Sequence, residues 1–146
     1  MEKELIINSS AAEVEIALLE NQKLVEIHRQ KTNSNFTVGD IFLGKVKKLM
    51  PGLNAAFVDI GYKKDAFLHY TDLGPTLRSL KKFTNQSITK ASKTHLLENF
   101  QFEPEIIKTG KINQVVNRKE PVLVQVLKEP ISTKGPRLSC EITIPG

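Results

Sequence analysis

Two phenylalanines, Phe57 and Phe67, stand in neighbouring apolar runs that a single turn separates. If these runs are adjacent strands, the two rings lie close together. Exposed aromatic rings offer flat surfaces on which nucleobases stack, a contact worth about 1–3 kcal/mol per base. The alternative is that both rings belong to the core, and the unbroken apolar run Ala55–Val58 favours it, because a strand buried on both faces shows no alternation. On composition alone the core interpretation is the better one.

Several lysines could supply phosphate contacts. Lys134 stands in a Thr-Lys-Gly loop, where the glycine allows a close approach of the backbone. Lys45, on the first apolar run, is a second candidate for a phosphate contact. Weaker candidates are Lys47, Lys63 and Lys64. For each of them an ordinary solvated lysine is the alternative.

One histidine also falls in this region. His69 follows Phe67 and Leu68 and could stack on a base or hydrogen-bond to one. A half-exposed residue at a strand end is the simpler interpretation, and the sequence alone favours it. His28 and His95 have no such context and are assigned no role.

The sequence offers no set of residues typical of catalysis or of a metal site. Hydrolysis of a phosphodiester with Mg²⁺ needs clustered carboxylates, and the only aspartates are Asp40, Asp59, Asp65 and Asp72. Asp59 and Asp65 lie beside a predicted turn and are expected to brace it. Cys140 is the only cysteine, which excludes an intrachain disulfide, and its apolar neighbours predict a buried, inert thiol. We therefore predict no catalytic and no metal-binding residue.

The region Gly39–Tyr70 must position the candidate side chains, and its pattern predicts three strands. They span residues 41–50, 53–60 and 65–70. The first turn between them is Pro51-Gly52, in which proline fixes φ and glycine supplies a left-handed conformation. Residues 61–64 form the second turn.

Strand patterns also flank this region. Residues 2–36 predict three short strands, because apolar residues alternate through the segment 14–18, and this period of two decides against a helix over 11–20. Two further strands are predicted over residues 121–127 and 137–144. The intervening residues 71–120 are polar and basic.

Within residues 71–120 the pattern is weak. Short helical turns are predicted near residues 76–83 and 112–116, and a mobile stretch is predicted around residues 84–103. A structureless insertion of this length would be unusual inside a compact domain. We therefore expect part of the segment to be ordered.

This order of elements predicts a mainly β fold. Three meandering strands, a long irregular connection and two further strands are typical of the OB-fold, a five-stranded barrel in which two strands and their loops form a binding face. An SH3-like barrel is the alternative.

The composition limits the class of protein. The chain has 146 residues, of which 40% are hydrophobic and 25% charged, which is the balance of a soluble globular protein. Its formal net charge of +5 is compatible with a polyanionic partner without naming one. No apolar run approaches the ~18 residues of a membrane span, and no secretory signal is visible. We expect a cytoplasmic protein without a membrane partner.

Three segments carry a family resemblance. They are GDIFLGKVKKLMPGLNAAFVDIG, DAFLH and VLVQVLKEPISTKGPRLSCEITIPG. They resemble the amino-terminal region of the ribonuclease E/G family, most closely its ribonuclease G branch. The resemblance implies an S1 domain, an OB-type RNA-binding barrel, over residues 37–136, with a long insertion at about 75–118. It also implies that residues 1–36 and 137–146 are flanking parts of an incomplete RNase H-like subdomain.

The resemblance also implies roles for individual residues. Phe57, Phe67 and Lys134 match the positions that contact RNA in the family, which favours exposed over core phenylalanines. Single-stranded RNA would then be the partner. The Mg²⁺-dependent catalytic site of the family lies in a downstream domain that nothing here matches, so this chain reads as a fragment that binds RNA and needs no cofactor of its own.

Two other functions remain open. The chain could be a scaffold or oligomerisation module, or a nuclease in its own right. The flanking strands lack the rest of their subdomain, so we expect either a small sheet built from both flanks or a homo-oligomer formed through them.

Overall fold

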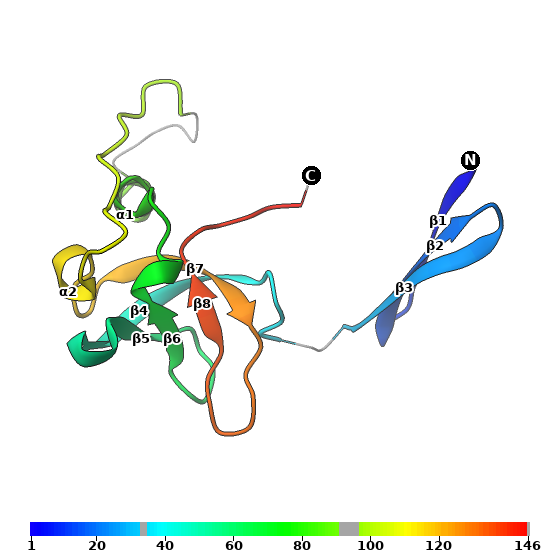
Figure 1. The fold of residues 1–146 in the computed structure, drawn as a ribbon, viewed down its shortest axis with the longest axis horizontal. Coiled ribbons are helices and arrows are strands. Elements are labelled where there is room, and N and C mark those ends of the chain that lie inside the picture. The colour runs from blue at the N-terminus through cyan, green and yellow to red at the C-terminus, as the bar shows by residue number, and fades with distance from the viewer. Residues whose placement is uncertain (33–34, 91–96, 146) are drawn as a thin grey trace. The chain divides into compact units, whose positions relative to one another are not determined.

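The computed structural model describes residues 1–32, 35–90 and 97–145 (Figure 1). The chain divides into two compact units, Met1–Asn35 and Phe36–Gly146. This division falls one residue from the boundary drawn after residue 36 in the sequence.

The amino-terminal unit is one antiparallel sheet in the order β1-β2-β3. Its strands confirm the three predicted, and they are β1 Lys3–Ser9, β2 Glu13–Glu20 and β3 Lys23–Lys31. Asn21 and Gln22 form the hairpin turn with φ values of 48° and 63°, as tight hairpins require. The described strands of this sheet all come from the amino-terminal flank. The expectation of a sheet built from both flanks, or of a homo-oligomer formed through them, stays a prediction.

The second unit contains a closed barrel in the order β4-β5-β6-β8-β7 (Figure 1). Its strands are β4 Ile41–Met50, β5 Ala55–Asp59, β6 Ala66–His69, β7 Pro121–Lys128 and β8 Arg137–Ser139. All pairings are antiparallel except that of β6 with β8. The predicted mainly β, five-stranded barrel with its long excursion after the third strand is confirmed.

Alternation along the strands fills the barrel interior. The side chains of Val46, Val58, Leu68, Val124 and Leu138 are at most 1% exposed, one from each strand. They form one hydrophobic core that also takes in residues of the insertion. Because inward residues alternate with outward ones, the same register that builds this core sets which side chains face outward.

The first turn differs from its prediction. Residues Pro51–Leu53 form a short 3₁₀ turn, η1, and the left-handed residue is Asn54, with φ of 49°, rather than Gly52. Asn54 also ties the insertion to the barrel, since its side chain accepts from the backbone N–H of Ile112 at 2.7 Å and donates to the carbonyl of Gly110 at 3.1 Å. An asparagine serves both purposes, because its short polar side chain tolerates this conformation.

The last strand also differs. β8 ends at Ser139, whereas the sequence predicted a strand to residue 144. Assigning all of residues 137–146 to a second subdomain is wrong for Arg137–Ser139, because this strand closes the barrel by pairing with β6 and β7.

The insertion carries two helices. They are α1 Leu77–Ile88 and α2 Ile112–Val115. Helix α1 is longer than predicted because Leu77, Leu80 and Thr84 form one stripe that packs toward the core, and the helix contacts β7. Of the predicted mobile stretch, residues 91–96 lie outside the described residues. Among the described helices, none has the length and apolar character needed to cross a membrane.

Candidate nucleic-acid interface

A row of outward-facing side chains crosses four strands of the barrel. Register pairs Lys48 of β4 with Phe57 of β5, Phe57 with Phe67 of β6, and Phe67 with Arg137 of β8. Residues directly opposite one another in a sheet project from the same face. We call these four residues the cross-strand row.

Both phenylalanines of the row are partly exposed. Their neighbours along the strands, Ala56, Val58 and Leu68, are fully buried on the opposite face. The apolar run that suggested a doubly buried strand therefore has one face in the core and an aromatic ring on the other. The core interpretation of Phe57 and Phe67 is wrong.

The two rings meet edge to face, with their centroids 5.9 Å apart and their planes at 66°. They are not stacked flat on each other, so flat ring surface remains for planar partners. His69 extends the aromatic surface along β6, with its ring centroid 6.2 Å from that of Phe67. Nδ1 of His69 accepts from the backbone N–H of Thr71 at 3.1 Å, so in the neutral ring Nε2 carries the proton and can donate.

Lys134 lies in the β7–β8 loop, which is held against the start of β6. The loop is tightened by a hydrogen bond from the N–H of Lys134 to the carbonyl of Ile131 at 3.0 Å. Next to Lys134, a Cβ on Gly135 would lie 2.9 Å from the carbonyl carbon of Asp65. The N–H of Phe67 donates to the carbonyl of Pro136 at 2.9 Å. The loop that carries the exposed Lys134 is thus bonded directly to the strand that carries Phe67.

Lysines of β4 border the row. Lys45 is exposed and lies opposite Asp59, two residues beyond Phe57 on the same face. Lys47 is bound to Asp65, with Nζ 3.0 Å from Oδ1. That hydrogen bond and the charge of Asp65 raise the pKa of Lys47, so its charge is held but locally compensated. Lys45 is therefore the better placed of the two for a phosphate.

The sequence model of the S1 RNA-binding domain matches residues 35–141. The chain belongs to the S1 RNA-binding domain family.

Relatives of the S1 domain include ribonucleases. The chain is 35% identical over 142 residues to ribonuclease G of Haemophilus influenzae and 32% identical over 145 residues to that of Escherichia coli K12, or 97% and 99% of its length. To ribonuclease E of a Nostoc species the chain is 44% identical over 110 residues. This stretch is 75% of the chain and 12% of that ribonuclease E. The chain spans 25% and 26% of the two ribonucleases G. The resemblance to the ribonuclease E/G family is confirmed for this stretch.

Two members of the row in the S1 domain were missed by sequence reasoning. Lys48 comes to lie opposite Phe57 because a bulge shifts the register of β4 after Val46. Arg137 joins the row through the single parallel contact of β8 with β6. Its guanidinium binds Asp72, with Nη2 2.7 Å from Oδ2, so part of its charge is compensated. No local pattern in the sequence signals either position.

Two aspartates of the S1 domain have structural partners. Asp59 accepts from the N–H of Gly61 at 2.9 Å, which confirms that it braces the second turn, and Asp65 binds Lys47. Within the described residues no three His, Cys, Asp or Glu side chains come together as a metal site would require.

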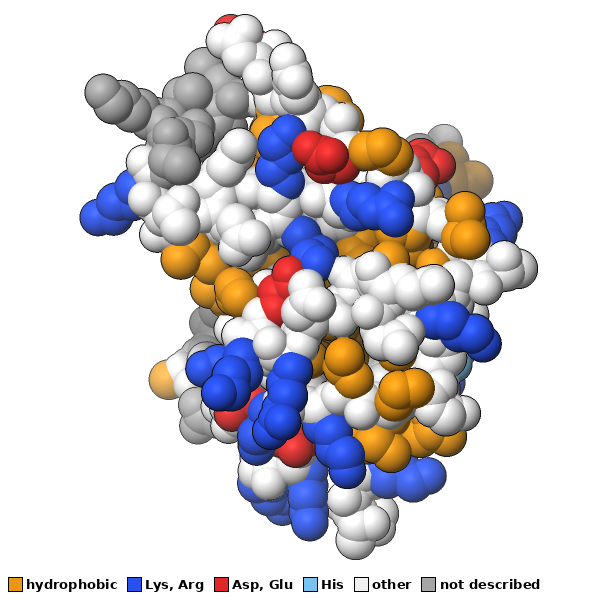
Figure 2. All heavy atoms as spheres, turned by 90° about the vertical axis from the view of Figure 1, so that its left-hand side faces the viewer, with side chains coloured by type: hydrophobic (Ala, Val, Ile, Leu, Met, Phe, Trp, Pro, Cys, Tyr) orange, Lys and Arg blue, Asp and Glu red, His pale blue; other side chains and the backbone are white. Residues whose placement is uncertain are grey.

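In Figure 2, Lys and Arg side chains are densest over the lower part of the face shown, with a few Asp and Glu side chains among them.

Cys140 is buried, and desolvation raises its pKa to about 12. Its thiol is therefore neutral at physiological pH, as the sequence predicted for an inert residue.

Proposed function

We propose that the S1 domain binds single-stranded RNA along the cross-strand row. Phe57 and Phe67 stack on bases, His69 donates from Nε2, and Lys45 and Lys134 contact phosphates. The observation that carries the proposal is the pair of partly exposed phenylalanines opposite each other on β5 and β6. In this position the two rings are not buried in the core, and the bases of an RNA strand would cover them.

The proposal predicts a salt-dependent interaction. A fluorescently labelled single-stranded oligoribonucleotide should bind with an affinity that falls as salt rises, because lysines displace counterions from phosphates. Lys45→Gln and Lys134→Gln should each reduce the slope of log affinity against log salt by about 1. Lys90→Gln, which removes an exposed lysine beyond helix α1, is the matched control. An absence of binding, or an affinity that does not change with the salt concentration, would refute the proposal.

We further propose that the longer protein is a cytoplasmic endoribonuclease of the ribonuclease G type. In it, the S1 domain would hold RNA for Mg²⁺-dependent hydrolysis by residues outside this chain. The identity to ribonucleases G over nearly the whole chain supports this. By the same resemblance, the β1–β3 sheet would belong to a subdomain of the RNase H type.

A second candidate function is self-association through the amino-terminal sheet. Leu5, Ile7 and Leu24 are 61%, 60% and 59% exposed, which leaves apolar surface on β1 and β3. Light scattering should then give a mass above that of one chain, with or without RNA. Charged substitutions at Leu5 and Leu24 should return it to the monomer mass. A monomer at all concentrations would exclude this function.

A further inference from the structure

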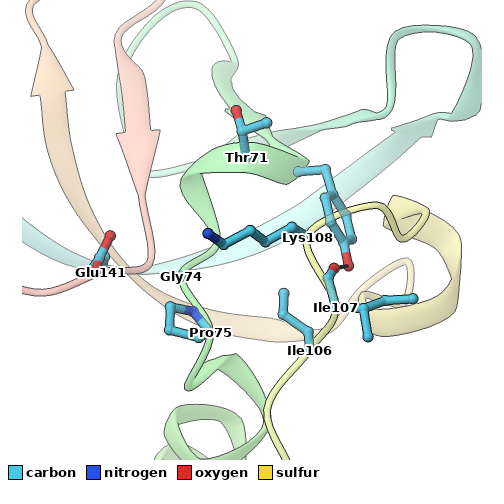
Figure 3. Close-up of a pocket in the computed structure, with 8 residues that line it drawn as sticks. Thr71, Gly74, Pro75, Ile106, Ile107, Lys108 and Glu141 are labelled. Atoms are coloured by element: carbon cyan, nitrogen blue, oxygen red, sulfur yellow. Dashed lines mark hydrogen bonds between the residues drawn. The ribbon is translucent and has the colours of Figure 1, made fainter.

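A pocket of about 320 Å³ lies beside the end of β6. Figure 3 shows three segments around it: the short turn η2, Tyr70–Asp72, with the following Gly74-Pro75; residues 106–108 of the insertion; and Glu141, beyond β8. Its volume is that of a small-molecule site, for which about 300 Å³ is the lower limit.

The pocket walls are fixed by hydrogen bonds. The hydroxyl of Tyr70 donates to the carbonyl of Ile107, and the N–H of Ile106 donates to the carbonyl of Pro75 at 3.0 Å. The first bond attaches the insertion to the residue that follows β6, and the second joins Ile106 to the start of the insertion. The ring of Tyr70, with Pro75 and Ile106, makes the lining largely apolar.

Two opposite charges lie at one side of this apolar cavity. In Figure 3 the Lys108 side chain extends toward Gly74. Glu141 adjoins the same glycine, because a Cβ on Gly74 would lie 3.2 Å from Cβ of Glu141. Within the described part of the chain, neither the Lys108 ammonium nor the Glu141 carboxylate has a hydrogen-bond or ion-pair partner. Both groups are therefore free to bind a ligand.

The pocket continues the aromatic surface of β6. Thr71 lines the pocket, and its Oγ1 lies 2.8 Å from Nδ1 of His69. The His69 ring in turn adjoins Phe67. Neighbouring side chains therefore run from Phe67 over His69 to Thr71 at the pocket.

We propose that this pocket receives the base of the nucleotide next to those stacked on the cross-strand row. The proposal rests on the proposed function. Lys108 contacts the phosphate of that nucleotide, and the Glu141 carboxylate accepts from an amino group on its base. Cytosine, adenine and guanine carry such a group and uracil does not, so the pocket selects against uracil.

The base preference tests Glu141. The probes are labelled decamers of cytidine and of uridine, titrated at one salt concentration against the parent chain and Glu141→Gln. The measured quantity is the ratio of the affinity for oligocytidine to the affinity for oligouridine. This ratio should be about tenfold higher for the parent than for Glu141→Gln, because a glutamine amide can donate to uracil as well as accept from cytosine. Comparing the ratio between the two chains removes differences that the homopolymers would show on any surface.

The salt dependence tests Lys108. Lys108→Gln should weaken binding of both decamers and reduce the salt slope by about 1, whereas Lys90→Gln should leave both unchanged. The pocket proposal is overturned if Glu141→Gln keeps the parent ratio or if Lys108→Gln behaves like Lys90→Gln. If Phe57→Ala still weakens binding in that case, the proposed function stands alone. If neither decamer binds the parent chain, both proposals fail.

Discussion

Replacing Phe57 and Phe67 together by alanine should lower the affinity for single-stranded RNA by about 2–6 kcal/mol, because each stacked base contributes about 1–3 kcal/mol. The two rings touch at a centroid distance of 5.9 Å, so the effects of the single variants should not add exactly. Fluorescence anisotropy with a labelled oligoribonucleotide at fixed salt measures all three variants. The double variant is decisive, because one remaining ring still offers a stacking surface.

The control for this prediction keeps the apolar bulk and removes the flat ring. Leucine at both positions covers the barrel strands much as phenylalanine does, and its melting curve should stay near that of the parent. It should nevertheless lose most of the stacking contribution. A leucine double variant that folds and binds RNA as tightly as the parent would show that these rings do not stack on bases.

The strands of the barrel and their sequence along the chain could be predicted because each strand depends on local alternation. β4 has the bounds that its apolar pattern indicated, and α2 lies within its predicted segment. The predicted final strand was too long, although its alternation continues to residue 144. The reason is a side chain: the amide of Gln125 donates to the carbonyl of Thr143 at 2.8 Å and accepts from its N–H at 2.8 Å. The side chain of the buried Gln125 thus makes the backbone hydrogen bonds that a neighbouring strand would otherwise make.

The candidate site was predictable only in part. Phe57 and Phe67 were found because they stand in neighbouring runs, but their exposure depends on which face the register turns outward. Lys48 and Arg137 depend on a bulge and on one parallel contact between residues 70 positions apart, neither of which has a local signature. The pocket at Lys108 and Glu141 needs segments from both sides of the insertion and could not be found from sequence.

Gly135→Ala should destabilise the barrel and weaken RNA binding together. A methyl group there would collide with the carbonyl oxygen of Asp65 and lie 3.1 Å from that of Lys64, both of which are backbone atoms that cannot turn aside. The β7–β8 loop must then move away from β6 and strain its bond from Phe67 to Pro136. We expect a loss of about 1–3 kcal/mol in the free energy of unfolding, measured by urea denaturation.

Gly52→Ala is the matched control, since a Cβ at Gly52 meets no atom within 4 Å and its φ is not positive. If Gly135→Ala were as stable as Gly52→Ala, the loop would not be held against β6 as described.

Comparison of Gly135→Ala with Lys134→Gln separates the effect of the charge of Lys134 from the effect of its position. Because the displaced loop keeps its lysine but carries it away from Phe67, Gly135→Ala should lower RNA affinity at least as much as Lys134→Gln while the chain keeps its charge. Equal RNA binding by Gly135→Ala and the parent would mean that Lys134 acts only as a mobile charge, and that its place beside the phenylalanines is irrelevant to binding.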